Sequence, residues 1–206
     1  MTRPPSRSRV KRSGSRTFDQ DEALEQATME FWPRGYEVTS VADLTRVMGI
    51  GAPGLYAAFG DKRALFEEVL RTYGATYGAL ATRALAEEPT ARAAVTRLLH
   101  EAASEFTDPA HPYGCLVISA AANCTSECVS TTLRDRRNAG LAAIESRIAA
   151  DIAAGRLPKS TDAGTLAGLS GAVFQGMSQQ ARDGATRAEL DAVAEAAMPA
   201  WPPDGR

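Results

Sequence analysis

The sequence predicts an all-α protein of about nine helices, in which a small unit of three short helices is followed by a larger helical domain. Alanine, the strongest helix former, supplies 39 of the 206 residues, whereas aromatic residues make up only 6%. Apolar residues recur at helical spacing, and the prolines stand at the ends of these periodic segments. Sandwiches, propellers and collagen are therefore excluded, and the 44% of hydrophobic residues is enough to bury a core.

The first 17 residues are expected to form a separate basic tail, in a chain whose net charge is -2. The tail carries six basic residues and no acidic one, on a stretch rich in serine and proline. It lacks the apolar stretch of a signal peptide, and residues 163–181 are too polar for a membrane span, so we expect a cytoplasmic protein. The tail either lies along DNA phosphates or is a solvated, disordered end, and both interpretations stay open.

Three short helices are predicted close together after the tail. The first covers residues 19–34, and Gly35 stands where a C-terminal glycine belongs. Ser40 and Asp43 have the spacing of a capping box for the second helix. The third covers residues 52–59 and has a proline in its first turn. Four apolar residues are expected to form the small core of this unit: Leu44, Ile50, Leu55 and Phe59.

The larger domain, residues 67–206, is predicted to be helical throughout. Apolar spacing, together with glycine and proline at the ends, indicates six further helices at residues 61–84, 91–106, 113–124, 129–154, 162–184 and 186–197. The first of these has Asp61 as its N-cap and is weakened by Gly74 and Gly78. Residues 113–124 also fit a buried strand, but no partner strand is visible, so a buried helix is predicted.

Residues 49–54 match the G-x-G-x-x-G spacing of dinucleotide-binding loops. That motif needs a buried strand before it and a βαβ unit around it, whereas the preceding segment here is a capped amphipathic helix. A nicotinamide enzyme is therefore an alternative that depends on the glycines alone. The same glycines make the tight turn of a helix-turn-helix, whose second helix enters the major groove of DNA.

The residues around this turn stand in a specific register: Gly35-Tyr36, Thr39-Ser40, Asp43-Leu44, Gly49-Ile50, Leu55-Tyr56, Phe59, Asp61-Lys62 and Ala64-Leu65-Phe66. This register resembles the N-terminal domain of the tetracycline-repressor (TetR) family of bacterial transcription factors, over about residues 19–70. The resemblance implies a helix-turn-helix DNA-binding domain at residues 18–66. It also implies a repressor that a small-molecule effector or a cysteine modification releases from a palindromic operator, although activation stays open.

The resemblance and the local chemistry together place the contacts with double-stranded DNA on nine residues: Thr39, Ser40, Ala42, Arg46, Ala52, Pro53, Gly54, Tyr56 and Lys62. Tyr56 and Lys62 resemble phosphate-binding residues of the family, and the charge of Lys62 opposes the helix dipole, which indicates a role other than helix stability. Thr39 and Ser40 either bind another phosphate or only cap a helix. Residues 18–66 carry four basic and eight acidic residues, so the basic tail is expected to add affinity.

The larger domain resembles the effector-binding and dimerisation part of the family, which implies a homodimer through the last two long helices. Residues 162–184 and 186–197 supply glycines and extensive apolar faces, the latter with Leu190, Val193 and Ala197. Burial within one subunit is the alternative. The residues expected to line an effector site or to sense are Tyr73, Tyr77, Phe106, Cys115, Ile118, Cys124, Cys128, Phe174 and Met177.

Three cysteines do not make a disulfide framework in a reducing compartment. They either sense an oxidant or electrophile or are small hydrophobic residues in an alanine-rich core. A thiol enzyme using Cys115, Cys124 or Cys128 is an alternative, but no C-x-x-C pair or obvious cysteine and histidine arrangement supports it. A metal site with His111 lacks the spacing of zinc sites. We therefore expect neither catalysis nor a cofactor.

Overall fold

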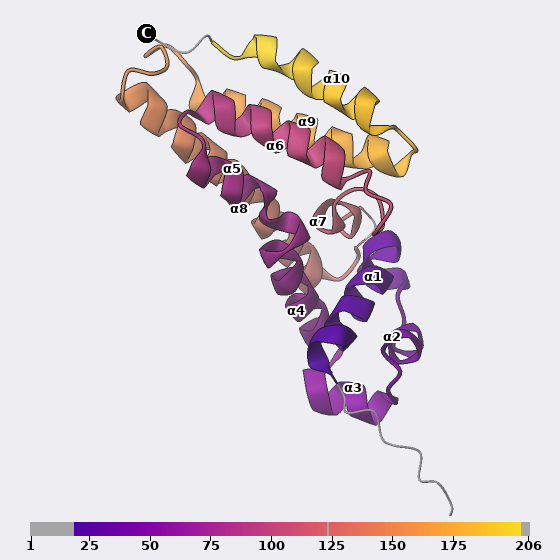
Figure 1. Ribbon diagram of the computed structural model, residues 1–206. Helices are drawn as coiled ribbons and strands as arrows, with labels where there is room; N and C mark the ends of the chain where they lie inside the picture. The colour runs from indigo at the N-terminus through magenta and orange to yellow at the C-terminus, as the bar shows by residue number, and fades with distance from the viewer. Residues whose placement is uncertain (1–18, 123, 203–206) are drawn as a thin grey trace, which may run out of the picture.

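The computed structural model describes residues 19–122 and 124–202, so the basic tail predicted at residues 1–17 lies outside the described residues. The described part contains ten α-helices, two 3-10 turns and no strand (Figure 1). The elements are α1 (Gln20–Val38), α2 (Val41–Met48), α3 (Ala52–Phe59), α4 (Lys62–Ala75), η1 (Tyr77–Ala79), α5 (Leu80–Glu87), α6 (Ala91–Glu105), α7 (Leu116–Ser119), α8 (Glu127–Ala153), α9 (Ala163–Arg182), α10 (Arg187–Ala197) and η2 (Met198–Ala200). The predicted all-α fold is confirmed.

Helices α1, α2 and α3 lie at one end of the molecule, and α5, α6, α9 and α10 lie at the other (Figure 1). Helices α4 and α8 run between the two ends (Figure 1). One continuous cluster of buried apolar side chains extends from Leu24 in α1 to Trp201 after α10. The end that carries α3 is therefore packed onto the rest of the protein through α1 and α4, with no break in the core.

The α2–α3 corner forms as its local sequence predicts. Ser40 and Asp43 make the capping box of α2, and Gly49 ends that helix with a left-handed backbone (φ +67°) that favours glycine. Leu44 and Leu55 are fully buried, while Ile50 and Phe59 are partly buried against the same core. The predicted four-residue core is confirmed, and it sets the angle between α2 and α3.

The helix predicted over residues 61–84 is wrong, because the chain is interrupted between α4 and α5. Gly78 lies against the ring of Tyr73, where an added Cβ would come within 2.9 Å of Cε1. The hydroxyl of Thr76 donates a hydrogen bond to the carbonyl of Thr72 at 2.9 Å, which satisfies one end of α4. The chain leaves the helical conformation at Thr76 (φ -112°, ψ -97°), and Gly78, one of the two glycines expected to weaken this helix, packs against Tyr73 in the turn that follows.

The buried helix predicted over residues 113–124 is also wrong, because only α7 is helical there. Gly114 has φ +79° and lies against α9, where an added Cβ would come within 2.7 Å of the carbonyl oxygen of Ser178. The amide of Cys115 donates to the hydroxyl of Ser178 at 2.9 Å. The backbone of this segment is therefore partly satisfied by α9 rather than by a helix of its own.

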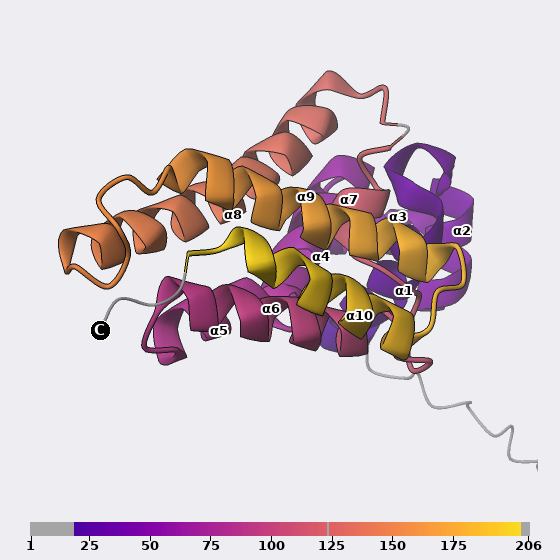
Figure 2. The ribbon, with the colours of Figure 1, turned by 90° about the horizontal axis from the view of Figure 1, so that it is seen from above.

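Helix α10 packs within the subunit, against α6 and α9 (Figure 2). Leu190 is fully buried, and Val193 and Ala197 pack against the core. His100 in α6 lies 2.7 Å from the carboxylate of Asp191 in α10. The expectation that residues 186–197 offer an open apolar face to a second subunit is corrected accordingly, since that face is already covered. Within the described residues, no helix combines the length and the apolar character needed to cross a membrane.

Candidate nucleic-acid interface

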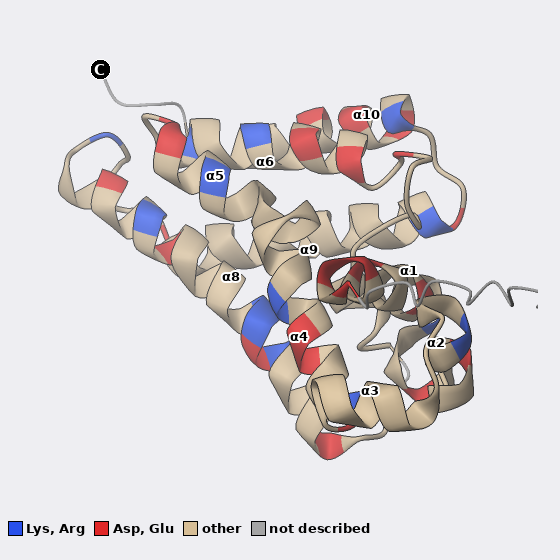
Figure 3. Ribbon diagram, turned by 60° about the horizontal axis from the view of Figure 1, so that its bottom comes forward, with Lys and Arg blue, Asp and Glu red and all other residues tan. Residues whose placement is uncertain are grey.

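Helix α3 exposes a smooth and uncharged surface. Leu55 points into the core and is fully buried, whereas the side chain of Tyr56 is 50% exposed. No charged residue lies on this helix, and it is tan along its whole length in Figure 3. The other exposed residues of α3 are Pro53, Gly54, Ala57 and Ala58. The only side chain on this surface that can form a hydrogen bond is therefore the phenol of Tyr56.

Lys62 begins α4, directly after the turn that follows α3. Asp61 caps this helix by accepting a hydrogen bond from the amide of Ala64 at 2.7 Å. The ammonium of Lys62 lies 4.2 Å from the centroid of the Tyr36 ring, a cation–π contact that orients the half-buried side chain. Burial lowers the pKa of Lys62, and the carboxylate of Glu37 partly opposes this shift. The start of α4 thus places the positive charge of Lys62 close to α3.

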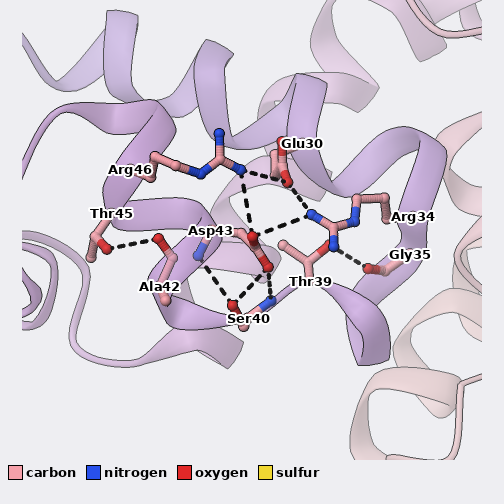
Figure 4. A network of polar contacts seen from close by, with 9 residues as sticks. All are labelled: Glu30, Arg34, Gly35, Thr39, Ser40, Ala42, Asp43, Thr45 and Arg46. Carbon is pink, nitrogen blue, oxygen red and sulfur yellow. Dashed lines mark hydrogen bonds and ion pairs between the residues drawn. The ribbon is translucent and has the colours of Figure 1, made fainter.

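The N-terminus of α2 is occupied by a carboxylate of its own (Figure 4). The hydroxyl of Ser40 donates to Asp43 Oδ2 at 2.7 Å and accepts from the amide of Asp43 at 3.1 Å. This hydroxyl is the main cause that holds the pKa of Asp43 well below its usual range, followed by the Ser40 amide and the nearby Arg34. A phosphate approaching Ser40 therefore meets a carboxylate as well as a hydroxyl.

Arg46 is the exposed positive charge of α2, with a side chain that is 65% exposed. Its Nη2 lies 3.4 Å from Asp43 and 3.7 Å from Glu30 of α1, and Arg34 bridges the same two carboxylates (Figure 4). These contacts hold the guanidinium of Arg46 on the outer side of α2. Glu30 and Arg34 were missed in the sequence, although their i, i+4 spacing is the local signal of a helical ion pair.

Thr39 has a structural task in this arrangement. It is fully buried, and its hydroxyl donates to the carbonyl of Gly35 at 2.8 Å. Its side chain is therefore not available to a phosphate, whereas Ser40 and Ala42 are exposed. Of the two neighbouring hydroxyl residues, only Ser40 stays in the set of proposed DNA contacts.

Glu37 joins the end of α1 to the segment that leads into α8. Its Oε1 accepts hydrogen bonds from the amides of Thr125 at 3.0 Å and Ser126 at 2.7 Å, and the thiol of Cys124 lies 3.7 Å away. The bond from the Ser126 amide is the largest cause that lowers the pKa of Glu37. Sequence reasoning missed this link, because nothing local to residue 37 indicates a partner about ninety residues away.

Most of the residues predicted to bind an effector belong to the hydrophobic core or pack against it. Tyr73 and Tyr77 pack edge-on against Trp32, and Phe106 packs against Phe174 with 5.0 Å between the ring centroids. Tyr73, Phe106, Cys115 and Met177 are buried, whereas Tyr77, Ile118 and Phe174 are partly buried. Cys124 is partly buried at the Glu37 link, and Cys128 is exposed at the start of α8.

A cavity of about 160 Å³ lies elsewhere, between the end of α1 and α7, and Arg34, Glu37 and Arg182 are among its lining residues. It contains none of the residues predicted to bind an effector. Among the residues that the structure describes, no three His, Cys, Asp or Glu side chains are grouped so as to hold a metal ion.

A family model described as "Bacterial regulatory proteins, tetR family" matches residues 23–69, which span α1 to α3 and the first half of α4. The HTH-type transcriptional repressor ComR of Escherichia coli (strain K12) is 35% identical over 201 residues, covering 94% of this chain and 94% of ComR. The chain belongs to the tetR family. The repressor BdcR of the same organism is 33% identical over 103 residues, which are 50% of this chain and 52% of BdcR.

This tetR-family protein also resembles a solved structure over almost its whole length. The structure is a cysteine mutant of the tetR-family regulator CifR, complexed with 26bp double-strand operator DNA and apo-CifR. It is 42% identical, has a TM-score of 0.87, and the match covers 92% of this chain and 100% of the CifR chain. The protein is therefore a DNA-binding transcriptional regulator, and these relatives decide against the thiol enzyme and the nicotinamide enzyme.

Proposed function

We propose that the protein is a homodimeric repressor that binds a palindromic operator with α2 and α3 of each subunit. The observation that carries this proposal is the exposed surface of α3, with Tyr56 on the helix and Lys62 directly after it. A helix with a smooth outer side fits the major groove, and a phenol and an ammonium beside it suit the phosphates of the groove wall. Ser40, Ala42 and Arg46 of α2 face the same duplex in this proposal.

We assign DNA binding, effector binding and dimerisation to the two predicted domains and the tail. Residues 18–66 bind DNA, and residues 67–206 bind an effector and form the dimer. The tail at residues 1–17 supplies six positive charges to a DNA-binding unit that is itself acidic, so it is proposed to lie along the operator phosphates. The proposed place of action is the cytoplasm, where the operator DNA of a bacterial cell is found.

Helices α8 and α9 are proposed to form the dimer interface. They lie side by side along one flank of the molecule (Figure 2) and pack against each other within the subunit. Their outer sides expose small residues, and Leu169 of α9 is an exposed large apolar side chain. The exposed small residues include Ala139, Ala142, Ala149 and Ala153 of α8, and Gly168 and Ala172 of α9. Small residues let helices approach closely, so two such pairs suit a four-helix bundle.

The DNA proposal is tested by selecting duplexes from a random pool with the full-length protein. We expect a palindrome with two half-sites, because a two-fold dimer presents two copies of α3 to one side of the duplex. Light scattering on the free protein is expected to give the mass of a dimer. A protein that stays monomeric, or that enriches no sequence, would contradict the proposal.

Regulation is proposed to act through the link between Glu37 and residues 124–126. The described contacts place Cys124 within 3.7 Å of Glu37, so a group added to this thiol would displace the carboxylate that ties α1 to α8. Burial raises the pKa of the Cys124 thiol, and burial also raises the pKa of Cys115. Burial therefore disfavours the thiolate, which is the nucleophilic form, at both cysteines. A small-molecule effector that moves the same link is the second proposed route.

A thiol reagent tests this route. In the variant with Cys115→Ala and Cys128→Ser, N-ethylmaleimide adds to Cys124 alone, and operator affinity is expected to fall on the order of tenfold. The matched control carries Cys115→Ala and Cys124→Ser, so that only the exposed Cys128 reacts, and its affinity is expected to stay unchanged. Equal operator affinity before and after labelling of Cys124 would contradict regulation through this thiol and favour the small-molecule effector.

A further inference from the structure

The glycine at position 54 of α3 is not required by the fold. The backbone at Gly54 is not in the left-handed region, and an added Cβ would meet only the Cβ of Ile50, at an ordinary contact distance of 3.6 Å. Glycine is also a poor helix former, so an alanine here would favour α3. A glycine that costs helix stability on an exposed surface, and that packing does not demand, indicates that something must approach the backbone closely.

The neighbours of Gly54 on the exposed side of α3 also have small or apolar side chains. Pro53 precedes it, and Ala57 lies one helical turn further along the same exposed side. We call Pro53, Gly54 and Ala57 the apolar stripe of α3. None of the three has a polar side-chain atom, and the N-terminal residues of a recognition helix are the ones that reach base edges. Tyr56 lies beside the stripe and is assigned to a phosphate.

The apolar stripe can distinguish bases only by their apolar groups. Every base presents hydrogen-bonding groups in the major groove that an apolar surface leaves unpaired, but thymine alone adds a C5-methyl group that such a surface can contact. We propose that the apolar stripe reads thymine C5-methyl groups in each operator half-site, with Gly54 as the residue that lets α3 come close enough. This inference rests on the proposed function, and it names the base feature that sets operator specificity.

The test uses the duplex that the protein itself selects from a random pool. We expect thymine at positions facing α3 in both half-sites. Replacing these thymines by uracil removes only the C5-methyl group, and the loss of one methyl contact per half-site is expected to lower affinity roughly tenfold. Guanine or cytosine at those positions, or uracil duplexes that bind within about twofold of the thymine duplex, would overturn the inference.

A protein variant tests the role of Gly54 independently. Gly54→Ala is expected to keep or raise the melting temperature while it lowers affinity for the thymine duplex on the order of tenfold. The same variant should lose most of the difference between thymine and uracil, because its Cβ holds α3 away from the methyl groups. Gly74→Ala is the matched control, since Gly74 is exposed in α4 and an added Cβ there meets only Arg136 at 3.6 Å.

The outcomes separate the inference from the proposal beneath it. The protein could select a palindrome and bind it equally well after uracil substitution and after Gly54→Ala. That result would support the proposed repressor and reject the readout of methyl groups. A pool from which no sequence is enriched rejects the repressor, and methyl readout with it.

Discussion

Replacing Asp151 by alanine is expected to lower the free energy of unfolding by about 3–5 kcal/mol, the cost of breaking a buried ion pair by removing one partner. Asp151 lies in the last turns of α8 and is completely buried. A buried carboxylate is tolerated only where its oxygens are paired, and the two oxygens of Asp151 have four partners among the described residues.

These partner atoms belong to three residues: Ala91 of α6, Arg147 of α8 and Arg156 just after α8. Oδ2 accepts from the amide of Ala91 at 2.6 Å, at the N-terminus of α6. Oδ1 accepts from Nε and Nη2 of Arg156 at 3.0 and 2.8 Å, and Nε of Arg147 lies 3.6 Å away. Arg147 in turn donates to the carbonyls of Leu85 and Glu88, which end α5. One carboxylate thus connects α8 to the α5–α6 turn, and its loss leaves the Ala91 amide without this acceptor and removes the ion-pair partner of Arg147 and Arg156.

Urea unfolding, monitored by circular dichroism, measures the effect. The free energies of unfolding are compared between variants whose dependence on urea concentration has the same slope. Asp135→Ala is the matched control, because Asp135 is exposed on the same helix and its loss is expected to change stability by less than about 0.5 kcal/mol. Asp151→Asn keeps the shape but loses the charge, so it is expected to fall between the two. A change for Asp151→Ala no larger than that for Asp135→Ala would mean that α8 does not depend on this cluster.

The parts of the fold that could be predicted from sequence are those determined within a few residues. The cap at Ser40, the left-handed turn at Gly49 and the burial of Leu44 and Leu55 each follow from side chains no more than about one turn away. The sequence indicates that Gly74 and Gly78 weaken this helix, but the break at Thr76 could not be predicted, because it depends on how the turn packs against Tyr73. The helical spacing of apolar residues carries no information about such contacts.

The same division holds at the candidate interface. The exposure of Tyr56 follows from the period of α3, since Leu55 must face the core. Thr39 and Ser40 look equivalent as a sequence, yet Thr39 is turned inward and bonds to the bend at Gly35. The Glu37 link joins segments that are far apart in the chain, so no pattern of spacing predicts it.

Lys62→Ala is expected to lower operator affinity on the order of a hundredfold, because a dimer loses two charge-assisted phosphate contacts and each contributes roughly tenfold. The side chain is already oriented over the Tyr36 ring at 4.2 Å, so little conformational freedom is lost when it binds. Fluorescence anisotropy on the selected duplex, at several salt concentrations, measures the effect. The slope of log affinity against log salt is expected to fall by about two, close to 0.9 for each phosphate.

Arg71→Ala provides the matched control for this substitution. Arg71 is exposed on the same helix, and its replacement removes the same charge. It lies about 14 Å further along α4 than Lys62, at 1.5 Å per residue. Its salt slope is expected to stay unchanged, and thermal unfolding of both variants shows whether the fold is intact. Equal losses of affinity and slope in the two variants would mean that only net charge matters, and that the corner between α3 and α4 does not face the DNA backbone.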